Sequence, residues 1–426
     1  MTSRLLLAAV LAAFVIAPAS ADNWPQWRGP KNDGHSTEKG LPIEWGPDKN
    51  VVWKLPMPGR GESTPCVWGD RIFLTSEVGE EVVLLCVGTD GKERWRKTLT
   101  KTGGSQNGPE KASDASASCS TDGKHVWSYV GGKRAGKLTC HDFDGTPVWE
   151  KDLKEYGKLD IAFGSHWTPV LYKGRLYLQV MHRAAELVVA LDAATGKEIW
   201  KVEAKGDGKK GTESPDVYAS AVMWEGEGGP LLIVHGNDTC SAHRLDDGTE
   251  VWRVGELNPP GPQNRAWRFV SCPMVSPDLI VVPTCKNGPT VGINPVGAKG
   301  TIVPGNAAEL WRITPTPDVL TPLRVGDLVY ILNGETLTAV EAKSGKQVYQ
   351  KRLEAKQRLY RSNLVVADGK IYIIGREGIG FVVRAGKDFE VLGTSDLRET
   401  VYASPAFSNG RIYIRGFEHL YCIGTK

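Results

Sequence analysis

Short runs of alternating apolar and polar residues, separated by glycine-containing turns, repeat along almost the whole chain. The clearest copy is Leu191 to Trp200, which reads L-D-A-A-T-G-K-E-I-W. Alternation with a period of two residues predicts β-strands, and the glycine between the two runs predicts a tight turn with a positive φ. An aromatic residue follows the turn glycine by four positions here and again after Gly91, Gly145, Gly248 and Gly345.

A second phrase precedes each of these units: a Ser-x-Pro-like start, a short apolar run, a glycine turn and an alternating strand. Ser63 to Ser76 is a clear copy. One repeat therefore contains four strands, and a period of roughly 48 residues is typical of β-propellers. Eight starts occur, at Ser63, Ser116, Thr168, Ser220, Ser271, Thr321, Ser362 and Ser404. They predict an all-β fold, an eight-bladed β-propeller of four-stranded antiparallel blades.

The last repeat is incomplete, because the chain ends at Lys426, just after its third strand at Leu420 to Ile423. The missing strand is available near the N-terminus, where Asn50 to Leu55 carries Trp53 before the first start. A ring closed in this way removes the exposed sheet edges that invite aggregation. We therefore predict that the N-terminal strand completes the last blade. Seven blades plus an independent hairpin is the alternative.

The residues before the first repeat predict export. A basic start at Met1 to Arg4, an apolar run at Leu5 to Ala17 that is too short to span a bilayer, and Ala19-Ser20-Ala21 form a signal peptide. Asp22 stands where a lipoprotein would need cysteine. We expect a signal peptide over 1–21, an N-terminal extension over 22–49 that packs on the propeller, and a single propeller over 50–426. The mature chain would be periplasmic or secreted, cleaved near Ala21, and not a lipoprotein.

Charge and cysteine content narrow the possible partners. The chain has 52 Lys and Arg against 49 Asp and Glu, too balanced for a nucleic-acid-binding protein. Three of its eight cysteines, Cys86, Cys140 and Cys422, fall at equivalent places on third strands. Cys66, Cys119 and Cys272 lie on or beside innermost strands, about 9–10 Å from the third strands and beyond disulfide reach. We interpret most of them as small core residues, with one disulfide as the alternative.

Motifs for catalysis or metal binding are missing from the sequence. It contains no C-x-x-C-H for haem, no histidine pair at metal spacing and no G-x-S-x-G elbow. Cys140-His141-Asp142 lies on a predicted strand, where neighbouring side chains point to opposite faces. Asn237-Asp238 is typical of a turn rather than a calcium site. We therefore predict no metal.

The phrase Ala190 to Trp200, A-x-D-x-x-T-G-K-x-x-W, resembles the tryptophan-docking repeat of the pyrroloquinoline quinone (PQQ) propeller superfamily. The start Asn23 to Pro30, N-W-P-Q-W-R-G-P, is similar to that of exported PQQ-like repeat proteins of planctomycete-type bacteria. The resemblance covers Trp24 to Gly424. The superfamily includes quinoprotein alcohol and sugar dehydrogenases, and also the propeller lipoprotein of the outer-membrane barrel-assembly machinery, which binds no quinone.

The resemblance implies particular features for a dehydrogenase. Those enzymes hold PQQ over a tryptophan floor, beneath a disulfide of adjacent cysteines, with calcium bound by Glu, Asn and Asp. No two cysteines are adjacent in this sequence, and no motif matches the calcium ligands. We therefore predict no cofactor, with PQQ and calcium as the alternative. The resemblance also implies that the aromatic residues of the repeat anchor each blade; these are Trp53, Trp95, Trp149, Trp200, Trp252, Trp311 and Tyr349.

Residues that enter the innermost strands should surround the mouth of the central channel. The candidates come from among the residues three and five positions before the proline position of each start, together with the two neighbours Trp167 and Arg361. The predicted ligand-binding set is Arg60, Glu62, His166, Trp167, Asp216, Tyr218, Arg268, Arg361 and Tyr402. Arginines suit an acidic ligand, and aromatic side chains can stack on a ring or sugar. The alternative is that strand-entry residues are polar because they are exposed, and that Trp167 packs between blades.

Three classes of function follow. Because catalytic motifs are missing, we predict an exported, non-catalytic binding or scaffold propeller whose channel mouth takes an unknown small ligand or a periplasmic protein partner. A PQQ-dependent quinoprotein dehydrogenase is the alternative. A hydrolase or lyase is the third class, in which Glu62 and Asp114 would act as the pair of carboxylates.

Overall fold

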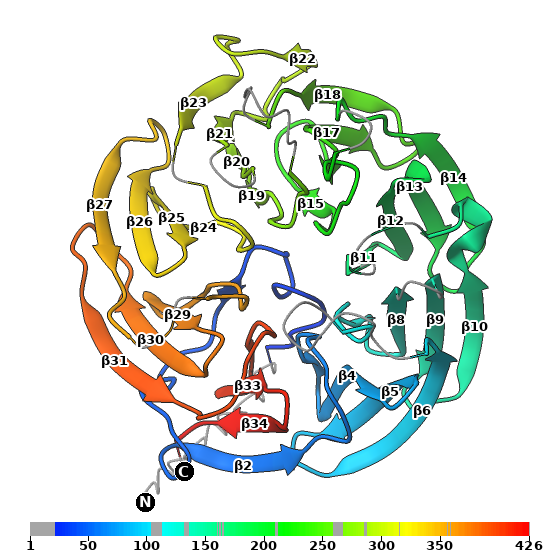
Figure 1. The fold of residues 1–426 in the computed structure, drawn as a ribbon, viewed down its shortest axis with the longest axis vertical. Helices are drawn as coiled ribbons and strands as arrows, with labels where there is room; N and C mark the ends of the chain where they lie inside the picture. The colour runs from blue at the N-terminus through cyan, green and yellow to red at the C-terminus, as the bar shows by residue number, and fades with distance from the viewer. Residues whose placement is uncertain are drawn as a thin grey trace, which may run out of the picture.

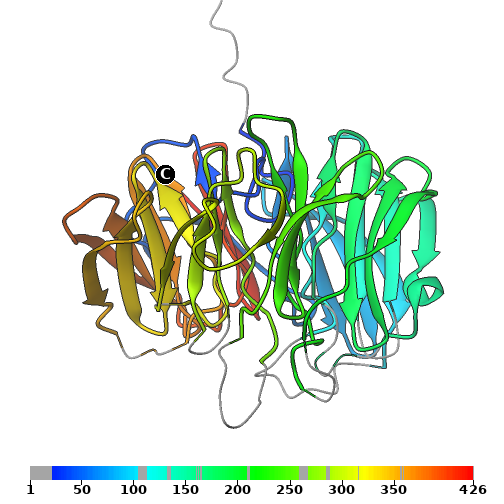
Figure 2. The same ribbon diagram turned by 90° about the horizontal axis from the view of Figure 1, so that it is seen from above.

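Eight antiparallel β-sheets stand around a central axis and form a closed ring (Figure 1). The computed structural model describes residues 22–425 except 104–112, 132–135, 160, 162, 164–165, 209–211, 259–266, 285–287, 315, 356 and 358. The signal peptide predicted over 1–21 lies outside the described residues. In the edge-on view the strands run from one face of the ring to the other (Figure 2). The fold is the predicted eight-bladed β-propeller.

Each blade begins with a short innermost strand and ends with a strand at the rim. Blade 1 consists of β3 (Cys66–Trp68), β4 (Arg71–Val78), β5 (Glu81–Gly88) and β6 (Glu93–Lys101). Blade 2 consists of β7 (Ser120–Thr121), β8 (His125–Gly131), β9 (Gly136–Asp142) and β10 (Pro147–Asp152), followed by the 3-10 helix η1 (Leu153–Tyr156). Blade 3 consists of β11 (Val170–Tyr172), β12 (Arg175–His182), β13 (Ala185–Asp192) and β14 (Glu198–Glu203). Blade 4 consists of β15 (Val222–Trp224), β16 (Leu231–Gly236), β17 (Thr239–Arg244) and β18 (Glu250–Val254).

The second half of the ring repeats this arrangement. Blade 5 consists of β19 (Met274–Ser276), β20 (Leu279–Val282), β21 (Thr290–Ile293) and β23 (Glu309–Ile313). Blade 6 consists of β24 (Leu323–Val325), β25 (Leu328–Asn333), β26 (Thr336–Glu341) and β27 (Gln347–Arg352). Blade 7 consists of β28 (Val365–Ala367), β29 (Lys370–Ile374), β30 (Ile379–Arg384) and β31 (Val391–Asp396). Blade 8 consists of β32 (Ala406–Ser408), β33 (Arg411–Arg415), β34 (His419–Ile423) and β2 (Val51–Pro56).

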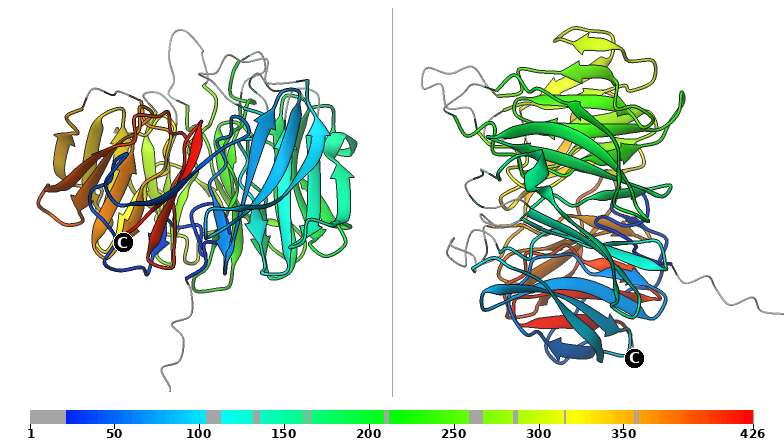
Figure 3. Two further views of the ribbon diagram at one scale, coloured as in Figure 1. Left: turned by 90° about the horizontal axis from the view of Figure 1, so that it is seen from below. Right: turned by 90° about the vertical axis from the view of Figure 1, so that its right-hand side faces the viewer.

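Strand β2 closes the ring, as the incomplete last repeat predicts. It pairs antiparallel with β34, with Trp53 opposite Cys422 and Leu55 opposite Leu420. The backbone N–H of Gly424 donates to the carbonyl oxygen of Asn50 at 2.9 Å, so the C-terminus lies beside β2 at the rim (Figure 3). Two further strands add to blades: β1 (His35–Ser36) pairs with β28, and β22 (Gly300–Ile302) pairs with β18, both in parallel.

The repeated glycine and the repeated tryptophan belong to neighbouring blades. The indole N–H of Trp149 donates to the carbonyl oxygen of Ala193 at 3.0 Å, in the turn of the next blade. In that turn Gly196 has a φ of 69°, and a Cβ atom added to it would lie 2.7 Å from the Trp149 ring. Glycine is therefore required both by the backbone conformation and by the close approach of the indole. The same pairing joins Trp53 to Gly91, Trp95 to Gly145, Trp200 to Gly248 and Trp311 to Gly345.

The third strand carries a small residue directly opposite each of these aromatic rings. Trp95, Trp149 and Trp53 face Cys86, Cys140 and Cys422, while alanine or glycine takes this place in blades 3 to 6. This register explains the equivalent positions of the three cysteines, because a thiol is small enough to lie under an indole. The seven described cysteines are all unpaired and buried, and Cys285 lies outside the described residues.

Blade 7 lacks an aromatic anchor, and the N-terminal extension supplies one. Gly393 on β31 lies opposite Val382, in the register where the other blades have tryptophan or tyrosine. Trp45 covers the same face: a Cβ atom added to Gly380 would lie 2.7 Å from its ring, and its backbone N–H donates to Ser395 Oγ at 2.9 Å. The Trp45 side chain is only 3% exposed. A residue from outside the repeats thus fills the gap in the pattern.

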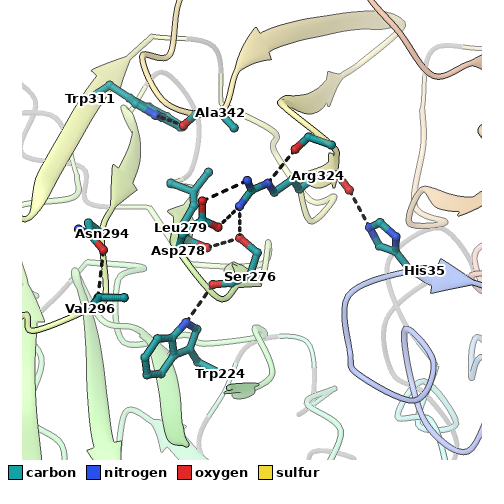
Figure 4. Close-up of polar contacts among 11 residues, drawn as sticks. His35, Trp224, Ser276, Asp278, Leu279, Asn294, Val296, Trp311, Arg324 and Ala342 are labelled. Carbon is teal, nitrogen blue, oxygen red and sulfur yellow. Dashed lines mark hydrogen bonds and ion pairs between the residues drawn. The ribbon is translucent and has the colours of Figure 1, made fainter. Parts of the chain in front are cut away.

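Side-chain hydrogen bonds tie neighbouring blades together near the centre of the ring (Figure 4). Trp224 in blade 4 donates to the carbonyl oxygen of Ser276 in blade 5 at 2.9 Å, and Arg324 in blade 6 donates to Ser276 Oγ at 2.7 Å and pairs with Asp278. His35 of the extension is bonded through Nε2 to the carbonyl oxygen of Arg324 at 2.7 Å. Through His35, the extension therefore takes part in the same hydrogen-bonded network that joins blades 4, 5 and 6.

Candidate functional site

All eight blades contribute to one central cavity of about 510 Å³. The residues that precede the innermost strands form its walls in two rings. The outer ring consists of Glu62, Ser116, His166, Tyr218, Val270, Val319, Arg361 and Tyr402. The inner ring, two residues further along each blade, consists of Thr64, Ser118, Thr168, Ser220, Cys272, Thr321, Asn363 and Ser404. Equivalent positions of every repeat thus face one space.

Hydrogen bonds between blades hold the inner ring in place. In six cases the backbone N–H of one member donates to the side chain of the next member around the ring. These bonds run from Thr64 to Ser118 (3.0 Å), Ser118 to Thr168 (3.1 Å), Thr168 to Ser220 (2.8 Å), Ser220 to Cys272 (3.1 Å), Thr321 to Asn363 (2.7 Å) and Asn363 to Ser404 (2.9 Å). The side-chain oxygen and sulfur atoms of the inner ring therefore satisfy backbone donors that would otherwise be buried without partners.

The N-terminal extension closes the cavity beyond the inner ring. In blade 1, Glu62 belongs to the outer ring and Thr64 to the inner ring. Val67 follows them along the chain and pairs with Trp24 of the extension. Trp27 lines the cavity, and the extension crosses the centre of the ring (Figure 1). Arg28 is fully buried beside it and donates to the carbonyl oxygens of Asn32, Asp33 and Pro322. Burial lowers the pKa of Arg28 to about 10.

Charged groups are distributed unevenly around the outer ring. Arg60 pairs with Glu62 at 2.7 Å, and Ser116 Oγ donates to the same carboxylate at 2.7 Å. Arg268 pairs with Glu213 at 2.8 Å and lies over the ring of Phe163. Arg361, by contrast, lines the cavity, is partly buried, and forms no hydrogen bond or ion pair with any described residue. The cavity wall therefore carries one arginine whose charge is not balanced by a contact within the described chain.

His166 and Tyr218 form a stacked pair on the opposite wall. Their ring centroids are 5.8 Å apart with an angle of 18° between the planes. Burial lowers the pKa of His166, although the nearby Glu62 carboxylate partly opposes this effect. The neutral imidazole donates from Nε2 to the carbonyl oxygen of Phe163 at 2.8 Å, since a carbonyl can only accept. Burial also raises the pKa of Tyr218, so both rings are neutral near pH 7.

Six of the nine predicted site residues line the cavity; they are Glu62, His166, Tyr218, Arg268, Arg361 and Tyr402. The other three lie outside it. Arg60 forms an ion pair with Glu62, and its guanidinium carbon lies 5.0 Å from the centre of the Phe417 ring. Trp167 is buried and stacked on Tyr129, with centroids 4.1 Å apart, because its side chain points away from that of its neighbour His166. Asp216 is buried and pairs with Arg183 at 2.8 Å.

The sequence argument missed the inner ring and the contributions of the extension. Serine or threonine immediately before the start proline was the available signal for the inner ring, because such residues recur in most repeats. Trp27 gave no such signal, since the extension has no repeat. Trp267, Phe163 and Asp318 also line the cavity and lie in the connections between blades.

Comparison with known families agrees with this architecture. A family model described as outer membrane protein assembly factor BamB matches three overlapping stretches, residues 78–253, 134–299 and 241–425. The chain belongs to this family. The match and the fold confirm the PQQ-like propeller that the docking repeat predicts, while the narrower resemblance to planctomycete-type proteins stays a prediction. No curated protein sequence matches the chain.

Solved structures show the same fold at low sequence identity. BamB from Moraxella catarrhalis aligns with a TM-score of 0.61 and 12% identity, over 88% of this chain and 99% of that chain. A quinohemoprotein alcohol dehydrogenase from Comamonas testosteroni aligns with a TM-score of 0.67 and 14% identity, over 96% and 81%. The dehydrogenase ADHIIG from Pseudomonas putida HK5 gives 0.63 and 14%, over 95% and 81%. Within the described residues, no helix is long and apolar enough to cross a membrane.

Proposed function

We propose that this protein is an exported, non-catalytic binding propeller whose central cavity takes a small anionic ligand. The observation that carries the proposal is Arg361, a partly buried guanidinium that faces the cavity without a partner among the described residues. An arginine in such a place binds a carboxylate or phosphate more strongly than it does in water. Export rests on the signal peptide predicted over 1–21, and a role toward a protein partner would rest on the family alone.

The contacts of the acidic residues favour binding over catalysis. Glu62 accepts hydrogen bonds from both Arg60 and Ser116, so both of its carboxylate oxygens are already bonded within the protein. Asp114, its predicted partner in hydrolysis, is not among the residues that line the cavity. The pair named in the hydrolase or lyase hypothesis, Glu62 and Asp114, therefore does not face the cavity together.

The cavity also does not fit PQQ with calcium as the dehydrogenases bind it. The family pattern requires adjacent cysteines, and the lining contains Cys272 alone. It further requires Glu, Asn and Asp oxygens for the metal. Here the Oδ1 atom of Asn363 accepts from Thr321, and both oxygens of Glu62 are bonded to Arg60 and Ser116. These oxygens are occupied by internal hydrogen bonds, so the alternative is not favoured.

A binding screen with an arginine variant tests the proposal. Trp27 and Trp267 line the cavity, so tryptophan fluorescence should report on small carboxylates and phosphates that bind there. We expect Arg361→Ala to abolish the fluorescence change while leaving the thermal unfolding midpoint nearly unchanged, because Arg361 has no partner to lose. Arg244→Ala, which alters an exposed arginine on β17, is the matched control. Unfolding of the Arg361 variant, or unchanged binding, would contradict the proposal.

A further inference from the structure

Several hydroxyl groups of the inner ring have a hydrogen that no described residue accepts. Ser118, Thr168 and Ser404 accept hydrogen bonds from backbone or amide N–H groups, and their own hydrogens are donated to no described residue, whereas the Ser220 hydroxyl is also bonded to Cys272. The Thr64 hydroxyl forms no hydrogen bond with any described residue, although its side chain lines the cavity. A hydroxyl group has one hydrogen to donate and two lone pairs. Four O–H donors that line the cavity, those of Thr64, Ser118, Thr168 and Ser404, are therefore available to the oxygen atoms of a ligand.

Acceptors and aromatic faces line the same cavity. Asp318 offers carboxylate oxygens, because it is exposed and forms no ion pair with a described residue. Trp27 and Trp267 line the cavity from the extension and from the connection before blade 5, both partly buried. Aromatic rings of this kind pack against the C–H faces of a ligand as well as against other rings. The cavity volume lies in the range of small-molecule sites.

This combination matches one class of ligand. A planar aromatic acid has few oxygens, all at its edge, and would leave most of the hydroxyl ring unsatisfied, which is costly in a closed site. A sugar carries hydroxyl groups on every side, which can accept from the inner ring and donate to Asp318. Arg361 adds the preference for a negative charge. We infer that the ligand is an acidic carbohydrate, a sugar that bears a carboxylate or a phosphate group.

The inference rests on the proposed function and is tested separately from it. Isothermal titration of the intact protein would compare digalacturonate, D-glucuronate and glucose 6-phosphate with the neutral sugars galactobiose and glucose, and with planar pyridine-2,6-dicarboxylate. We expect at least one acidic sugar to bind about tenfold or more tightly than its neutral counterpart, as the loss of one charge-assisted hydrogen bond implies. The uronates and the sugar phosphate distinguish the two sources of negative charge.

Two variants locate the binding. Arg361→Gln should weaken the acidic sugar by about tenfold to a hundredfold and remove its advantage over the neutral one. Thr64→Val keeps the shape of the side chain and removes a hydroxyl that is bonded to no described residue, so the fold should be unaffected; affinity should fall about threefold to tenfold. Arg244→Gln should change neither affinity.

The other binding results would each refute the ligand class, the need for a negative charge or the contact with the inner ring. Binding of the planar acid without any acidic sugar would keep the proposed function and refute the carbohydrate class. Equal binding of acidic and neutral sugars would refute the requirement for a charged ligand. Unchanged affinity in Thr64→Val would show that the hydroxyl ring does not touch the ligand. If none of the compounds binds, both the carbohydrate class and the proposed function fail.

Discussion

Replacing Trp45 with alanine tests whether the N-terminal extension supplies the missing anchor of blade 7. Its side chain is 3% exposed and packs over Gly380 and Tyr372, whose ring lies 6.3 Å away at an angle of 18°. Because the rest of the extension has further contacts with the blades, including β1 with β28, the variant should still fold. The effect on stability can then be assigned to the indole itself.

The expected cost follows from the buried area. A tryptophan side chain buries about 150–250 Å², which at about 25 cal/mol/Å² corresponds to roughly 4–6 kcal/mol. The Trp45 indole N–H is buried without a partner among the described residues, which offsets about 1–3 kcal/mol of this gain. We therefore expect Trp45→Ala to lower the free energy of unfolding by about 1–5 kcal/mol, the difference between these two contributions. Trp45→Phe keeps most of the ring, removes the unpaired N–H, and should change stability by less than about 1.5 kcal/mol.

Urea unfolding followed by far-UV circular dichroism measures both values. The signal reports the β-sheets and is independent of the tryptophan that is replaced. A loss below about 1 kcal/mol in Trp45→Ala would mean that Trp45 rests on blade 7 without stabilising it. A large loss in Trp45→Phe would show that a phenyl ring does not fill the place of the indole, and the small cost expected for this variant would then be refuted.

Three further predictions concern the turns, the closure and a buried histidine. Gly196→Ala should lower the free energy of unfolding in urea by at least about 1 kcal/mol more than Gly174→Ala does. Both glycines have a positive φ, but only Gly196 lies against an indole, that of Trp149. Equal losses in the two variants would contradict the packing of Trp149 on this turn. Deleting the mature chain through Leu55 should cost about 3 kcal/mol or more by removing β2, and an unchanged midpoint would argue against closure by β2. Burial lowers the pKa of His235 from 6.5 to about 4, so the unfolded chain binds this proton first as pH falls. The free energy of unfolding should therefore fall between pH 6.5 and 4, by about 2 kcal/mol at pH 5 relative to pH 7. His235→Gln should lose this part of the pH dependence. If the dependence is unaltered in the variant, it does not arise from His235.

The blades could be predicted because each repeat carries its own local signal. A glycine turn between alternating runs identifies a hairpin without reference to the rest of the chain, and the lack of a fourth strand after Ile423 points directly to the strand that contains Trp53. Contacts of the extension could not be predicted in this way. Trp27 and Trp45 lie outside the repeats, and their positions depend on surfaces that exist only once several blades have formed.

Within the site, too, positions set by the repeat could be predicted and positions set by tertiary contacts could not. Six predicted residues line the cavity because equivalent positions of a symmetric ring must face one axis. In blade 7 the start lacks proline and the register is one residue later, so Arg361 rather than Tyr360 takes the outer-ring place. Trp167 was misplaced for a simpler reason: adjacent residues of an extended chain point in opposite directions. Whether an arginine has an ion-pair partner, as Arg60 does and Arg361 does not among the described residues, depends on the groups that surround it and cannot be read from spacing.

The pairing of β2 with β34 also affects the order in which the molecule can be completed. Strand β2 precedes the first blade in the chain, and its partner β34 is synthesised only after seven full blades. Contacts between such distant segments form slowly, because the entropy of a long loop must be lost before they contribute. Until then, β2 and the rim of blade 8 each present unpaired backbone groups to any other extended chain. The feature that leaves the finished ring without open edges therefore makes the nascent chain vulnerable for nearly its whole synthesis.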